Sequence, residues 1–158
     1  MNPEYRFDSS HLEWIHYEGG PRFDYHIDYK LAVLGYQEDS GLLDLMIEWA
    51  PNSYCHFHRH VAATTTLVLQ GAHHVVDLDE NGAETEHHVR PAGTYRHSTG
   101  GDLHMEYGGP QGATVLFTMY EPNGHMFDVL DNDHNVIGVS SITELARQAE
   151  EHAAIEAG

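Results

Sequence analysis

The sequence predicts an all-β domain, a barrel or jelly roll followed by one C-terminal helix. Short apolar and β-branched segments recur along the chain and are separated by turn-forming residues. With 158 residues, 41% of them apolar and 20% charged, the chain is long enough for one hydrophobic core. We therefore expect a single domain over residues 1–158, divided into an N-terminal arm (1–29), a barrel (30–139) and a C-terminal helix (141–156).

The predicted strands follow one another at short intervals. In residues 42–50 apolar and polar side chains alternate, as they do in a strand with one buried face. Asp79-Glu80-Asn81-Gly82 has the Asn-Gly pair of a tight hairpin turn. Gly71 is expected to separate two strands, and residues 108–112 are expected to form a loop. The strands are predicted at 30–36, 42–50, 64–69, 72–78, 84–90, 103–105, 113–120, 125–130 and 135–139.

The C-terminal segment carries a helix signal. Ser141-Ile142-Thr143-Glu144 has the spacing of a capping box, in which the first and fourth residues satisfy the free N–H groups of the first turn. Leu145 and Ala149, with His152 or Ala153, then fall on one face. These features predict a helix from about Ile142 to about Ile155.

The charge balance excludes two classes of partner. The chain has 7 Lys plus Arg against 25 Asp plus Glu, a formal net charge of −18. Such a surface repels phosphate backbones and anionic headgroups, so we expect neither nucleic-acid nor membrane-surface binding. No basic segment followed by an apolar run begins the chain, and the single cysteine, Cys55, has no partner for an internal disulfide. A cytoplasmic location is therefore expected.

Histidine is the unusual component, with 15 residues. His56, His58 and His60 alternate with other residues, so in an extended chain they point the same way. Two imidazoles spaced in this manner converge on one metal ion, and a third ligand from elsewhere in the chain would leave positions open for substrate. The stretch therefore predicts a catalytic metal site.

Other histidines are given ordinary structural roles. His73-His74 and His87-His88 are adjacent pairs whose members face opposite ways on a strand, and we expect them on solvated hairpin faces. Cys55 is expected to be a small core residue.

The histidine stretch resembles the first motif of the cupin family, His-x-His-x(3–4)-Glu-x(6)-Gly. His58-Arg59-His60 is followed by three residues, Thr64, six residues and Gly71, with threonine in place of the glutamate. This spacing favours His58 and His60 and makes His56 a flanking residue. Pro91-Ala92-Gly93 resembles the Pro-x-Gly of the second cupin motif, which implies a downstream histidine ligand, either His97 or His104.

Gly101-Asp102-Leu103-His104 is similar to a segment of the acetylacetone dioxygenase-like and dihydroxyacetophenone dioxygenase-like cupins, which have three-histidine, non-haem iron sites. That resemblance implies a metal bound by His58, His60 and His104, with His97 as the alternative third ligand. It implies Fe(II), with Zn, Ni or Mn as alternatives, and a homo-oligomer, a dimer or tetramer. Thr64, Thr66 and Gln70 are the nearby candidates for accepting the second ring N–H of a ligand.

The same resemblance implies a dioxygenase that cleaves a C–C bond in a β-diketone or related carbonyl substrate, with O2 as co-substrate. Three neutral imidazoles leave the full charge on a divalent ion, which suits an anionic, chelating enolate. Two alternatives remain open. One is a metal-dependent lyase, hydrolase or isomerase that uses Zn, Ni or Mn as a Lewis acid, and the other is a non-catalytic cupin that binds a small molecule.

Overall fold

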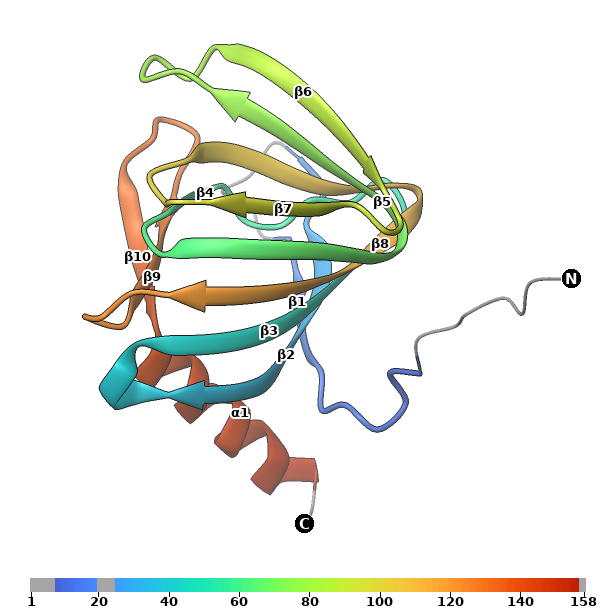
Figure 1. Cartoon of the computed structure of the whole chain (residues 1–158). Helices are drawn as coiled ribbons and strands as arrows, with labels where there is room; N and C mark the ends of the chain where they lie inside the picture. Colours follow the sequence, from blue (N-terminus) through green and yellow to red (C-terminus); the bar gives the residue numbers. More distant parts are fainter. Residues whose placement is uncertain (1–7, 20–24, 157–158) are drawn as a thin grey trace, which may run out of the picture.

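A computed structural model describes residues 8–19 and 25–156. Most of these residues lie in strands, and the chain ends in a helix (Figure 1). The elements are β1 (Ile15–Glu18), β2 (Asp28–Gln37), the short 3-10 helix η1 (Glu38–Ser40), β3 (Leu42–Trp49), β4 (His58–His60), β5 (Ala63–Leu78), β6 (Glu84–Pro91), β7 (Tyr95–Ser98), β8 (Leu103–Tyr120), β9 (His125–Leu130), β10 (Val136–Ser141) and α1 (Ile142–Glu156).

The strands form one strongly curled sheet. Its order is β1-β2-β3-β8-β4-β9-β10, and β5 pairs with β6, β7 and β8. The pairings described here are antiparallel, and the sheet bends into a half-barrel whose lower side is covered by α1 (Figure 1). The all-β barrel architecture predicted from the sequence is confirmed.

Two strands are longer than the sequence suggested. β5 passes through Gly71 and β8 passes through residues 108–112, so the predicted break and loop were wrong. Gly71 and Gly112 have φ values of 69° and 76°, and register shifts in the pairing accompany them. A Cβ atom on Gly71 would collide with the carbonyl oxygen of Gly112. Glycine thus lets both strands bend where their backbones touch, without ending the ladder.

The C-terminal helix begins at the predicted position. The Glu144 backbone N–H donates to Ser141 Oγ at 3.2 Å, which is one half of the capping box. The Glu144 carboxylate does not complete the box, because it accepts hydrogen bonds from Arg147 and Gln148 instead. Ile142 and Leu145 are buried on the side of the helix that faces the sheet.

The described part of the N-terminal arm belongs to the sheet. β1 pairs with β2, with Ile15 opposite Leu31, and Tyr17 Oη donates to Gln148 of α1 at 3.0 Å. The rest of the predicted arm, 1–7 and 20–24, lies outside the described residues. Among the described residues, no helix is long and apolar enough to cross a membrane.

Candidate metal centre

Three histidines come together where β4 pairs with the start of β8. β4 is three residues long, and strand alternation turns His58 and His60 inward while Arg59 is exposed. His104 of β8 lies directly opposite His58 in the antiparallel pairing. All three imidazoles are buried, so the structure brings together the three histidines that the sequence suggested as candidate ligands, with His104 rather than His97 as the third.

Glu106 is a fourth member that the sequence reasoning missed. It lies two residues after His104 on the same face of β8 and is 3% exposed. Its Oε2 atom is 3.1 Å, 3.7 Å and 3.6 Å from Nε2 of His58, His60 and His104. The cupin motif places its glutamate at position 64, whereas the alternation in Leu103-His104-Met105-Glu106 indicates an acidic side chain on the same face as His104.

The geometry fits a divalent metal ion. One nitrogen or oxygen atom from each of the four side chains lies within 4.8 Å of the others. His58 Nε2 and His60 Nε2 are 2.9 Å apart, and His104 Nε2 is buried with no hydrogen-bond partner among the described residues. Three imidazole nitrogens and a carboxylate are the ligands that Fe, Zn, Ni and Mn take in proteins.

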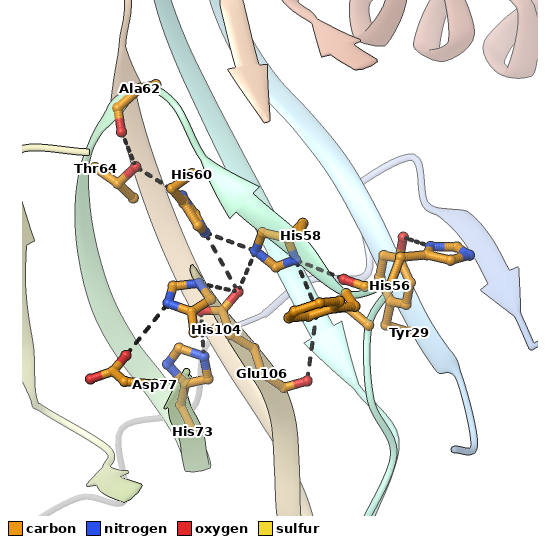
Figure 2. Close-up of polar contacts among 12 residues, drawn as sticks. Tyr29, His56, His58, His60, Ala62, Thr64, His73, Asp77, His104 and Glu106 are labelled. Carbon is orange, nitrogen blue, oxygen red and sulfur yellow. Dashed lines mark hydrogen bonds and ion pairs between the residues drawn. The ribbon is translucent and has the colours of Figure 1, made fainter. Parts of the chain in front are cut away.

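Hydrogen bonds to the other ring nitrogens orient the ligands (Figure 2). Thr64 Oγ1 donates to Ala62 O at 3.0 Å, so the same oxygen accepts from His60 Nδ1 at 3.1 Å. His58 Nδ1 donates to His56 O at 2.7 Å. Because Nδ1 carries a proton in both rings, Nε2 is the atom left for a metal. Thr64, at the glutamate position of the cupin motif, thereby becomes a support for His60.

The protonation states are compatible with such a site. Burial would raise the pKa of the Glu106 carboxyl, but the charge and hydrogen bonds of the surrounding imidazoles hold that pKa well below its usual range. Burial lowers the pKa of His60 to about 4. Burial acts in the same direction on His58, but Cys55 and Glu106 outweigh it and raise the pKa of His58. The lowered pKa of Glu106 leaves an ionised carboxylate at the centre, which suits a metal cation.

His73 corrects the expectation of solvated histidine pairs. It is fully buried, stacks on Trp49 with ring centroids 5.0 Å apart, and places Nε2 3.0 Å from Glu106 Oε1. Its neighbour His74 points the other way and is half-exposed. The opposite orientation of the two rings was predicted correctly, but β5 is covered on one face and His73 lies on it. His73 thus contacts Oε1 of Glu106, whereas Oε2 lies beside the three clustered histidines (Figure 2).

The other candidate residues are not members of the cluster, although His97 and Thr66 line the polar cavity beside it and His56 lines the apolar one. His97 is exposed on β7 and contacts Thr65 Oγ1 at 3.0 Å. His56 precedes β4 and its Nδ1 is 2.9 Å from Tyr29 Oη, so it does not share the orientation of His58 and His60. Gln70 is exposed on β5. Thr66 is buried and lines a cavity next to the centre.

Two cavities of different character meet at the metal-ligand cluster. The apolar cavity, of about 310 Å³, reaches His58, His60 and Glu106, and its wall includes Leu31, Ile47, Phe127, Val129 and Leu145. The polar cavity, of about 370 Å³, reaches His60, His104 and Glu106, and its wall includes Thr66, Asp77, Arg90, Arg96 and Asp102. An ion held by the cluster would be approachable from both sides.

Comparison of the whole structure with solved structures identifies the architecture. An acetylacetone dioxygenase from Acinetobacter johnsonii superposes with a TM-score of 0.69 at 13% identity, over 94% of this chain and 91% of that chain. An RmlC-like cupin protein from Ralstonia eutropha gives 0.71 at 14% identity, over 94% of this chain and 85% of that one. The chain has the cupin fold.

A third cupin-fold structure supports this assignment. A cupin 2 conserved barrel domain protein from Rhodopseudomonas palustris has a TM-score of 0.61 at 12% identity, over 91% of this chain and 89% of that one. No protein-family model and no curated protein matches the sequence. These similarities establish the cupin fold, and the buried cluster supplies the argument for chemistry.

Proposed function

We propose that this cupin is a non-haem Fe(II) dioxygenase that cleaves a C–C bond in a β-diketone or related chelating carbonyl substrate. The observation that carries the proposal is the buried cluster of His58, His60, His104 and Glu106, which two cavities of different character reach. Two approaches suit a reaction in which a chelating substrate and dioxygen must both reach one ion. The likeness to an acetylacetone dioxygenase supports this choice among cupin activities.

The protein would contribute positioning and a dry environment. Thr64 and the backbone carbonyl of His56 fix the tautomers of two ligands, and His73 holds Glu106 in place. The apolar cavity has a largely apolar wall and room for an apolar substituent or for dioxygen, which is itself apolar. A bound ferrous ion would supply Lewis-acid polarisation of the substrate carbonyls and the redox chemistry that dioxygen requires.

Glu106 favours a second candidate function. A carboxylate in the ligand set reduces the net positive charge of the centre from the value expected with three neutral imidazoles. A Lewis-acid lyase, hydrolase or isomerase that uses Zn, Ni or Mn is compatible with such a set. The cytoplasmic location and homo-oligomeric state inferred from the sequence remain predictions.

Oxygen consumption tests the first proposal. Metal-free protein is loaded anaerobically with Fe(II), Zn(II), Ni(II) or Mn(II), and O2 uptake is recorded with a series of β-diketones and hydroxyacetophenones. We expect uptake only with Fe(II), one O2 per carbonyl substrate cleaved. His104→Ala should abolish both metal retention and uptake, whereas His97→Ala should preserve metal retention. A fully iron-loaded protein that consumes no O2 with any of these substrates would refute the dioxygenase assignment, and cleavage or isomerisation with another metal would support the second candidate.

A further inference from the structure

Two arginines face the polar cavity of a strongly acidic protein. The chain has only 7 cationic side chains against 25 acidic ones, and both Arg90 and Arg96 line this cavity. Because the net charge of −18 repels anions from the molecule as a whole, an anionic ligand would need a local cationic group to bind.

The strand pairing brings the two guanidinium groups to the same side of the sheet. Arg90 on β6 pairs with His73, and Arg96 on β7 pairs with Thr66, both on β5. Cross-strand partners share a face, and His73 and Thr66 are both buried on the inner face. The turn between β6 and β7, Ala92-Gly93-Thr94, thus joins two strands whose arginines both line the cavity.

Neither arginine has an ion-pair or hydrogen-bond partner within the described part of the chain, although carboxylates line the same cavity. Those carboxylates have other partners. Asp77 Oδ2 lies 3.0 Å from His88 Nε2, and Asp102 accepts a hydrogen bond from Ser98 Oγ. Arg90 is half-buried, and burial lowers the pKa of its guanidinium despite the opposing charge of Glu106. Its charge is therefore only partly compensated by the protein.

The cavity is continuous with the candidate metal centre, because His60, His104 and Glu106 form part of its wall. If the arginines bound the carboxylate of a substrate, the carbonyl groups next to that carboxylate would lie close to the cluster of His60, His104 and Glu106. A planar carboxylate matches the donor geometry of guanidinium groups.

We propose that Arg90 and Arg96 form a carboxylate subsite, so that the substrate of this cupin is a dicarbonyl compound that also carries a carboxylate, such as a 2,4-dioxo acid. The inference rests on the proposed function for the dicarbonyl part and on the two arginines for the carboxylate. It places the charged end of the substrate in the polar cavity. The apolar cavity is then left for an alkyl substituent or for dioxygen.

Binding of a matched pair of ligands tests the subsite without relying on turnover. Calorimetric titration of Zn(II)-loaded protein with 2,4-dioxopentanoate and with pentane-2,4-dione compares two dicarbonyls, one with and one without a carboxylate. Because charge-assisted hydrogen bonds are strong, we expect the carboxylate to improve affinity by about tenfold or more. The preference should fall to within about threefold in Arg90→Gln/Arg96→Gln and be retained in Arg147→Gln, whose target is an exposed helix residue already paired with Glu144 and Glu151.

Two results would overturn the proposal. One is equal affinity of the wild-type protein for both ligands. The other is a preference that persists in the double variant, since the metal rather than the arginines would then hold the carboxylate. Zinc content and melting temperature are measured for each variant, and the single variant Arg96→Gln, at an exposed position, provides the same comparison if the double variant fails to fold. Oxygen uptake by Fe(II)-loaded protein is recorded separately, so an intact binding preference without uptake would refute the dioxygenase proposal while supporting the subsite.

Discussion

Replacing Glu106 by glutamine tests whether the fourth side chain of the cluster binds the metal. Glutamine keeps the size of the side chain but removes its charge. Glu106 is 3% exposed, and its Oε2 lies within 3.1–3.7 Å of three ligand nitrogens, so a metal at this centre would be close to the carboxylate. The carboxylate is already desolvated in the metal-free protein, so metal binding incurs little further cost from burying it.

The expected loss follows from the charge. Two unit charges 4 Å apart interact by about 4 kcal/mol at an effective dielectric constant of about 20, and the value doubles for a divalent ion. If the neutral oxygen of glutamine recovers half of this, about 4 kcal/mol is lost. Because each step of about 1.4 kcal/mol is a factor of ten, we expect metal affinity to fall by about a thousandfold in Glu106→Gln.

Competition with a chromophoric chelator measures the dissociation constant for Zn(II) or Fe(II) in each protein. Glu84→Gln is the matched control, because Glu84 is an exposed residue of β6. Its affinity should equal that of the wild-type protein. If Glu106→Gln bound metal within threefold of the wild-type affinity, Glu106 would not be a ligand and the three-histidine site inferred from the sequence would stand unmodified.

Three further predictions concern the support of the site and the fold. Thr64→Val removes the acceptor for His60 Nδ1, so we expect metal affinity to fall by about tenfold in a chelator competition assay. Thr65→Val is the control, and equal affinities of the two variants would contradict the role given to Thr64. Gly71→Ala combines a φ of 69° with a collision against Gly112, and it should lower the free energy of unfolding by about 2 kcal/mol or more in urea. Gly35→Ala is its control, because a Cβ atom there meets nothing within 4 Å, and equal losses in the two variants would disprove the steric argument. In the metal-free protein, burial lowers the pKa of His60 from 6.5 to about 4. Between these pH values the unfolded state binds one more proton than the folded state. The free energy of unfolding should therefore fall on acidification, by up to about 3 kcal/mol. The wild-type protein should therefore lose more stability than His60→Gln over that range, and parallel pH profiles would contradict the assignment.

Several features could be predicted because they depend on residues close together in the sequence. The spacing from His58 and His60 to Gly71 indicated which two histidines of the stretch point inward from one strand. The helix start at Ser141 was also local, since a side-chain oxygen three residues before a backbone N–H is sufficient to cap a helix. The prediction failed at Gly71 and Gly112 for the same reason. Local sequence identifies glycines as breaks, whereas pairing with a neighbouring strand lets β5 and β8 continue through them.

The sequence by itself thus determined the all-β class, the terminal helix and the histidine pair of the opening cupin motif. The tertiary structure decided which distant side chains complete the centre. Glu106 and His73 come together only because β8 and β5 pair in the curled sheet. Arg90 and Arg96 line the same cavity only because β6 and β7 pair with the same edge of β5. Alternation assigns each side chain to one of two faces, but closure of the sheet determines which face is buried and which residues meet there.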